Sequence, residues 1–160
     1  MADRLSGCDC LALGPAMASA DAGGRVMDAL LPAAGSGPVV MDAACIEAVA
    51  SRLDAVAALS GGAVLTPHAG EMAQLTGLDC DEIEARREAV AVEYAGRLDA
   101  VLLVKGSTTL IASARSATSI GTANTSSTRW PSRNRSAIGV VGVSVVLIRS
   151  RVDDDPSSVQ

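Results

Sequence analysis

The chain has 160 residues and a formal net charge of −5, and 49% of its residues are hydrophobic. This length and apolar content predict one folded domain with a core and exclude a chain that is disordered throughout. Only 1% of the residues are aromatic, so the core is expected to consist mainly of Ala, Val and Leu. The negative charge argues against nucleic acid as the main partner.

The cysteines and the apolar runs indicate the cellular compartment of the protein. The four cysteines are Cys8, Cys10, Cys45 and Cys80, and the chain has a single histidine. That set predicts reduced thiols in a cytoplasmic protein and no metal site. No basic segment followed by an apolar one begins the chain, and the longest apolar run, 137–148, is too short to span a bilayer. We therefore expect no signal peptide and no membrane partner.

Apolar runs and helix-like segments alternate over residues 9–113. The elements predicted in the first part are a strand at 10–14, a helix at about 20–32, a strand at 38–43 and a helix at 45–59. Gly23 and Gly24 weaken the start of the first helix. Asp42 ends the second strand, where it is predicted to be the N-cap of the next helix, although a role at a ligand-binding edge is the alternative.

The alternation continues in the second part. The predicted elements are a strand at 63–66, a short helix at about 69–76, a helix from Asp81, and strands at 100–106 and 108–113. Asp81 and Glu84 have the spacing of a capping box. Favourable i,i+4 ion pairs are expected at Glu82–Arg86 and Glu93–Arg97. The alternation predicts an α/β fold with a parallel sheet and helices on both sheet faces.

Turn-forming residues and chemically active side chains follow several of these strands. They are Gly14-Pro15, Asp42, Thr66-Pro67-His68 and Lys105-Gly106. Ligands of parallel sheets bind beyond the carboxyl ends of the strands, so one edge is expected to carry the chemistry. At His68, the only histidine, Pro67 makes the backbone rigid, Gly70 permits close approach, and Glu71 suits the helix dipole. This turn predicts a polar ligand site, with a purely structural histidine as the alternative.

The segment from Lys105 to Thr109 follows the clearest strand. A cation, turn amides and hydroxyl groups are the donors that suit phosphate oxygens. The segment lacks the G-x-x-x-x-G-K-[ST] pattern of a Walker A loop. An ordinary hairpin turn with a solvated lysine is the alternative.

Taken together, the motifs have the order and spacing of a known family. They are "LGPAM", "VVMDA", "VLTPHAGEMAQLTG", "LLVKGSTTLIAS" and "TANT" (122–125). Over residues 8–125 the chain resembles the ADP/ATP-dependent NAD(P)H-hydrate dehydratases, which have a ribokinase-like fold. The resemblance implies dehydration of the S epimer of hydrated NADH or NADPH, coupled to ADP or ATP hydrolysis with Mg²⁺, in the repair of nicotinamide nucleotides.

The resemblance also implies roles for individual residues. Gly14 and His68 match substrate-contacting positions. The nucleotide-contacting positions matched are Lys105, Gly106, Ser107, Thr108, Thr109 and Asn124. In this chain Ala16, Ala18 and Ala44 replace two glycines and an aspartate that the family usually has. The glycine-flanked loop whose aspartate is the family's catalytic base is not found after "TANT", so no catalytic residue is assigned and weak or no activity is expected.

Residues 126–160 change in character and match no family element. They are rich in Arg, Ser, Val and Gly, and we predict an irregular tail whose composition fits a frame shift in a GC-rich gene. An Arg-rich segment that binds nucleic acid is the rival hypothesis. A full domain of this fold would have about as much sequence again, so open sheet edges that favour aggregation are expected. A homo-oligomer is a further expectation. The alternative functions are a small-molecule kinase for a vitamin-precursor alcohol and a non-catalytic remnant.

Overall fold

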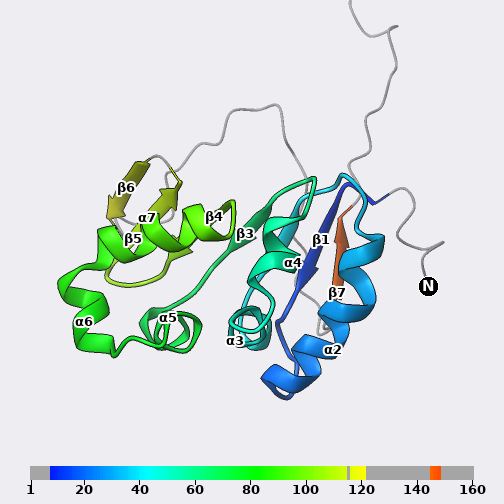
Figure 1. The fold of residues 1–160 in the computed structure, drawn as a ribbon, viewed down its shortest axis with the longest axis horizontal. Helices are drawn as coiled ribbons and strands as arrows, with labels where there is room; N and C mark the ends of the chain where they lie inside the picture. Colours follow the sequence, from blue (N-terminus) through cyan, green and yellow to red (C-terminus); the bar gives the residue numbers. More distant parts are fainter. Residues whose placement is uncertain (1–7, 115, 122–144, 149–160) are drawn as a thin grey trace, which may run out of the picture.

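The computed structural model describes residues 8–114, 116–121 and 145–148, which contain a seven-stranded sheet (Figure 1). The strands are β1 (Cys10–Leu13), β2 (Val39–Met41), β3 (Ala63–Leu65), β4 (Ala100–Val104), β5 (Thr108–Ser113), β6 (Ser116–Gly121) and β7 (Val145–Ile148). The helices are α2 (Ala20–Leu30), α3 (Ala44–Val49), α4 (Leu53–Ala57), α5 (Ala69–Thr76), α6 (Cys80–Ala85) and α7 (Arg87–Arg97), with a 3-10 turn η1 at Leu31–Ala33. None of the helices in these ranges is long and apolar enough to cross a membrane.

The sheet has the order β6-β5-β4-β3-β2-β1-β7. Strands β1 to β4 are parallel, which confirms the predicted parallel sheet. Strands β5 and β6 continue antiparallel at one edge, and β7 pairs antiparallel with β1 at the other. The predicted irregular tail therefore contains at least one strand, and β7 covers the side of β1 that faces away from β2.

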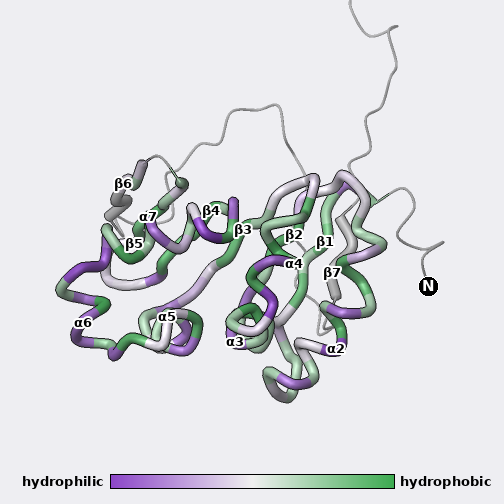
Figure 2. The backbone as a smooth tube through the Cα atoms, in the orientation of Figure 1, coloured by the Kyte–Doolittle hydropathy of each residue, from purple (hydrophilic) through white to green (hydrophobic). Residues whose placement is uncertain are grey.

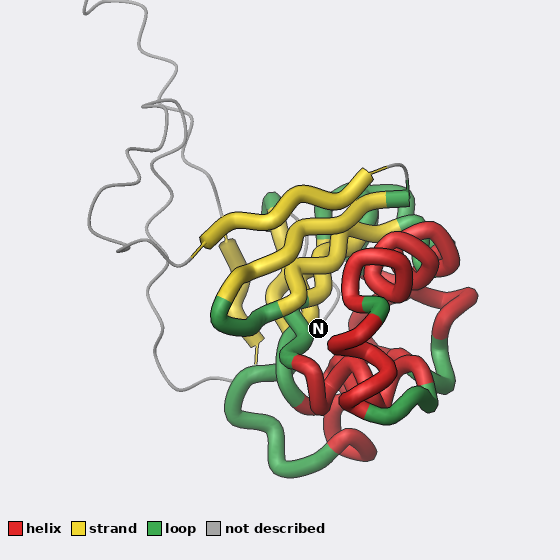
Figure 3. The backbone as a smooth tube through the Cα atoms, turned by 90° about the vertical axis from the view of Figure 1, so that its left-hand side faces the viewer, coloured by secondary structure: helices red, strands yellow, loops and turns green. Residues whose placement is uncertain are grey.

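The described helices cover one face of the sheet (Figure 3). Each parallel strand lies directly beside the next one in the chain, and right-handed crossovers then place every connecting helix on the same side. The prediction of helices on both faces is thus correct for one face only within these ranges. On the other face Val40 and Val64 are half-buried and Val101 is 36% exposed.

The core lies between the sheet and the helices. Strand residues Leu13, Met41, Leu65 and Leu102 are fully buried there, and they belong to one cluster with Met27, Ile46, Met72 and Ile83 from the helices. Hydrophobic residues accordingly follow the central strands, while hydrophilic residues recur along the helices (Figure 2). The core is aliphatic as predicted; its one aromatic member, Tyr94, donates its hydroxyl to the Thr76 carbonyl at 3.1 Å.

Two predicted helices begin or end differently in the structure. The helix predicted at 45–59 is broken into α3 and α4. The Arg52 amide donates to the Val49 carbonyl at 2.7 Å, while the Ala48 carbonyl, which a continuing helix would use, accepts from the Ser51 and Arg52 side chains. The capping box at Asp81 and Glu84 is wrong, since α6 begins at Cys80 with Asp79 as its N-cap.

Two predicted ion pairs are confirmed, with nitrogen–oxygen distances of 3.2 Å for Glu82–Arg86 and 3.9 Å for Glu93–Arg97.

Candidate functional site

Asp42 lies at the centre of the carboxyl edge of the sheet. Its Oδ1 accepts hydrogen bonds from Lys105 Nζ and from Thr66 Oγ1, each at 2.8 Å. The side chain makes no capping bond to α3, whose N-cap is Ala43, so the prediction of Asp42 as a helix cap is wrong. Three neighbouring strands, β2, β3 and β4, end at these three residues, and their parallel pairing brings the side chains together.

The surroundings of Asp42 favour its charged form. Partial burial is the largest single effect and raises the pKa of Asp42, but the hydrogen bonds from Lys105 and Thr66 and the positive charge of Lys105 lower it. The net result is a pKa below the ordinary value of 3.8. Asp42 is therefore a carboxylate at neutral pH, and it is 34% exposed.

The His68 turn is a closed capping box at the start of α5. His68 Nδ1 accepts from the Glu71 amide at 3.1 Å, and the His68 amide donates to Glu71 Oε2 at 2.8 Å. Gly70 leaves room for the imidazole itself, because a Cβ there would lie 3.0 Å from His68 Cε1. With Nδ1 as an acceptor, a neutral ring carries its hydrogen on Nε2, and the ring is 58% exposed. His68 Nε2 lies 3.6 Å from Glu71 Oε1, so the ring has a structural role within the turn while much of its surface stays open to solvent.

The His68 turn and the Lys105 turn lie side by side. The Lys105 amide donates to the Pro67 carbonyl at 2.7 Å, and His68 and Lys105 form a parallel bridge. Glu71 is only 11% exposed, and its Oε2 lies 3.7 Å from Lys105 Nζ. Two motifs that are separate in the sequence therefore form one surface.

Gly14 has an internal reason for being glycine. It is buried, its φ is 121°, and a Cβ there would overlap the carbonyl oxygen of Asp42. Next to it, Ala16 has a φ of 63°, a value that favours glycine. The predicted contact of Gly14 with substrate stays a prediction, because packing against Asp42 already explains the glycine.

The turn after β4 has a second cation beneath it, which the sequence interpretation missed. Arg87, from the start of α7, donates from Nη2 to the Val104 carbonyl at 2.9 Å, and a Cβ on Gly106 would lie 2.6 Å from the same nitrogen. Arg87 Nε is buried and has no hydrogen-bond partner among the described residues. No local pattern distinguishes Arg87 from its neighbour Arg86. Asn124 lies outside the described residues.

The described residues contain no group of three or more His, Cys, Asp or Glu side chains that could hold a metal ion. Asp42 and Glu71 contribute two carboxylates on either side of Lys105, which suits a Mg²⁺ ion that keeps phosphate and water ligands but not a site made by protein alone. Burial raises the pKa of the Cys45 thiol to about 11, so this cysteine is no candidate nucleophile.

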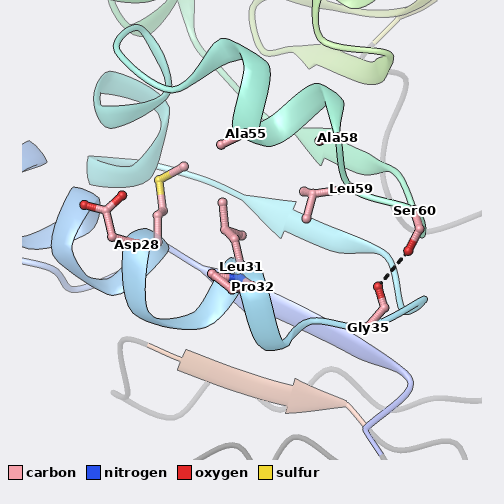
Figure 4. Close-up of a pocket in the computed structure, with 9 residues that line it drawn as sticks. Asp28, Leu31, Pro32, Gly35, Ala55, Ala58, Leu59 and Ser60 are labelled. Atoms are coloured by element: carbon pink, nitrogen blue, oxygen red, sulfur yellow. Dashed lines mark hydrogen bonds between the residues drawn. The ribbon is translucent and has the colours of Figure 1, made fainter.

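A pocket of about 500 Å³ lies between α2, η1 and α4 (Figure 4). Its lining includes Met27, Leu31, Ala55 and Leu59, and at one end Ser60 Oγ donates to the Gly35 carbonyl at 2.9 Å. These residues precede β2 and β3, so the pocket is at the amino ends of the strands, opposite the site around Asp42.

The parallel sheet, with its polar groups at the carboxyl edge, defines an α/β protein, and solved structures show that its fold is ribokinase-like. A ribokinase-like superfamily protein from Enterococcus faecalis has the same fold, with a TM-score of 0.60 at 18% identity over 71% of this chain and 39% of that chain. The NAD(P)H-hydrate dehydratase family model matches residues 1–130. The chain therefore belongs to the NAD(P)H-hydrate dehydratase family.

Individual relatives agree with this assignment. The bifunctional NAD(P)H-hydrate repair enzyme Nnr of Moorella thermoacetica is 39% identical over 110 residues, 69% of this chain and 21% of the relative. The ADP-dependent (S)-NAD(P)H-hydrate dehydratase of Bacillus subtilis is 33% identical over 64% of this chain and 34% of the relative. A Bacillus subtilis ADP/ATP-dependent NAD(P)H-hydrate dehydratase crystallised with ATP/Mg²⁺ has a TM-score of 0.58 at 29% identity, over 72% of this chain and 40% of that chain. The chain thus spans less than half the length of these relatives, between 21% and 40%.

Proposed function

We propose that this chain carries the ligand-binding edge of an ADP- or ATP-dependent dehydratase for the S epimer of hydrated NADH or NADPH. The observation that carries the proposal is the direct pairing of the His68 turn with the Lys105 turn. In that arrangement His68 Nε2 is available as a donor to the substrate. Lys105 and the turn up to Thr109 offer a cation, amides and hydroxyl groups to the nucleotide phosphates.

The family reaction assigns a task to this edge. The substrate hydroxyl oxygen attacks the terminal phosphorus of ADP or ATP and loses its proton to a base, while the phosphoanhydride bond breaks and AMP or ADP leaves. Phosphate then leaves with that oxygen as a ring proton is lost, which restores NADH or NADPH. Magnesium, when bound with the nucleotide, would neutralise phosphate charge near Asp42 and Glu71. The base and anion hole of this reaction are not found in the sequence after residue 125, so we propose that binding persists while turnover is slow.

The test measures binding and turnover separately on the 160-residue chain. Calorimetry with ADP and Mg²⁺ should show binding that Lys105→Met weakens to a lower but still measurable affinity. Arg97→Met is the matched control, because Arg97 ends α7 at the other end of the sheet, and this variant should bind as the wild type does. Turnover is followed by the recovery of NADPH absorbance from its S hydrate.

Three results would contradict the proposal. Equal loss of ADP binding in the Lys105→Met and Arg97→Met variants would refute the nucleotide site. Phosphorylation of a small alcohol without NADPH recovery would favour a related kinase. Rapid NADPH recovery by this chain would refute the slow-turnover part.

A further inference from the structure

We infer that Asp42 is a positioning residue, which holds the ammonium group of Lys105 in place for a nucleotide phosphate. The inference rests on the proposed nucleotide site and adds to it a residue that was predicted to cap a helix, with a role at the ligand-binding edge as the alternative. Asp42 follows β2, Lys105 follows β4, and Thr66, at the end of the strand between them, donates to the same carboxylate oxygen. One carboxylate therefore ties three neighbouring strand ends together.

The backbone of Lys105 is fixed independently of this contact. Its amide donates to the Pro67 carbonyl at 2.7 Å, and the residue pairs with His68 in a parallel bridge. The four-carbon side chain nevertheless retains several rotatable bonds, and ordering a lysine on binding costs conformational entropy. The hydrogen bond to Asp42 fixes the far end of that side chain before any ligand arrives, and such preorganisation increases affinity.

The hydrogen bond to Asp42 leaves the Lys105 ammonium group with donors for a ligand. An ammonium group has three donors, and within the part of the chain that the structure describes Nζ uses one of them, in its hydrogen bond to Asp42 Oδ1 at 2.8 Å. Glu71 Oε2, at 3.7 Å, contributes charge without a hydrogen bond. The Lys105 side chain is 40% exposed, so donors directed to solvent remain for phosphate oxygens.

A competing electrostatic effect predicts the opposite change in nucleotide affinity. A carboxylate beside a phosphate site repels the phosphate, so removal of Asp42 would tighten nucleotide binding if its charge mattered more than its hold on Lys105. The partial exposure of both partners weakens this repulsion, because water screens it. We therefore expect the positioning effect to dominate.

Lys105 is the only lysine in the chain, so its side chain can be observed alone. The 160-residue chain is prepared with ¹³Cε-lysine as the wild type, Asp42→Asn and Thr66→Val. Asp28→Asn is the matched control, since Asp28 is a salt-bridged aspartate that pairs with Arg52 at 2.7 Å and not with Lys105. The NMR signal of the Lys105 Cε group reports its mobility, and calorimetry with ADP and Mg²⁺ reports affinity.

In Asp42→Asn, the Lys105 signal should become that of a mobile lysine, and ADP affinity should fall about tenfold, the scale set by lysine side-chain entropy. Thr66→Val, which keeps the carboxylate, should change both readouts less, and Asp28→Asn should change neither. In a Lys105→Met background, Asp42→Asn should have no further effect on ADP binding. That non-additivity separates action through the lysine from a general loss of fold.

The outcomes separate this inference from the proposed function. If Asp42→Asn frees the Lys105 signal while ADP binds equally or more tightly, the positioning role is overturned and the nucleotide site stands. If wild-type chain binds no ADP, the nucleotide site itself is refuted and the positioning role falls with it. Should Asp42→Asn fail to fold, an unchanged Lys105 signal and unchanged affinity in Thr66→Val would overturn the inference instead.

Discussion

Gly14 allows the packing explanation of a predicted ligand-site residue to be tested directly. In the Gly14→Ala variant the new Cβ would overlap the carbonyl oxygen of Asp42, far inside the 3.0 Å that real Cβ contacts respect. The obstacle is backbone and not a flexible side chain, so β1 and β2 must separate at their carboxyl ends. The φ of 121° adds strain for any residue with a Cβ.

The expected loss of stability follows from these two terms. Overpacking of this kind costs about 1–3 kcal/mol, and a residue with a Cβ in a sparsely populated backbone region costs about 1–3 kcal/mol more. We therefore expect Gly14→Ala to lower the free energy of unfolding by roughly 3 kcal/mol or more, a large share of the stability of a small domain. Asp42 would move with the strand, so the variant should also lose the Lys105 contact.

Gly35→Ala is the matched control. Gly35 also has a positive φ, 62°, but nothing lies within 4 Å of a Cβ placed there. This variant should lose only about 1 kcal/mol from backbone strain. Equilibrium urea unfolding followed by far-ultraviolet circular dichroism gives both free energies. If Gly14→Ala costs no more than Gly35→Ala, the packing explanation of Gly14 is refuted, and a glycine required by the ligand becomes the better explanation.

Three further predictions use the same unfolding measurement. Ala16→Gly relieves a φ of 63° and should stabilise the chain by roughly 0.5 kcal/mol, whereas a loss of stability would show that this loop conformation is not adopted. Gly23→Ala should destabilise the chain by about 1 kcal/mol, because its Cβ would lie 2.7 Å from an α3 carbonyl oxygen. Gly96→Ala is the control: no atom lies nearer than 3.8 Å to its Cβ, so it should stabilise the chain by roughly 0.5 kcal/mol. Equal effects of the two substitutions would contradict the close packing of α2 against α3. The lowered pKa of Asp42 contributes stability that is present above the ordinary pKa of 3.8 and is lost as the pH falls through the folded-state pKa. The difference in unfolding free energy between wild type and Asp42→Asn should therefore shrink on acidification. A pH-independent difference would contradict the charge interaction.

The general architecture could be predicted because apolar runs and helical spacing are local signals. The strands before His68 and Lys105 were recognisable in this way, and parallel strands place their carboxyl ends at one edge whatever the order of the sheet. That rule brought the two turns together correctly. The arrangement of helices on one face required the strand order, which no local pattern contains.

The role of Asp42 could not be predicted for a different reason. An aspartate at the end of a strand and before a helix is equally suited to a cap and to an ion pair. The choice is made by Lys105, which lies 63 residues further along the chain. The formation of strand β7 likewise depends on a long-range partner, because it pairs with β1 near the other end of the chain. The split between α3 and α4 depends on side-chain bonds from Ser51 and Arg52 that helical periodicity does not reveal.

The site also separates ground-state binding from catalysis. The groups around His68 and Lys105 are fixed by strand pairing and by the capping box of α5, all within residues that the structure describes. In the proposed function such groups would contact bound substrate and nucleotide before reaction, and uniform binding of this kind does not by itself accelerate the chemical step. A base and an anion hole act on the transition state, and their loss typically lowers turnover by orders of magnitude. The proposed function therefore requires that ADP affinity and turnover respond independently, so that changes at Asp42 or Lys105 alter the first while the second stays low throughout.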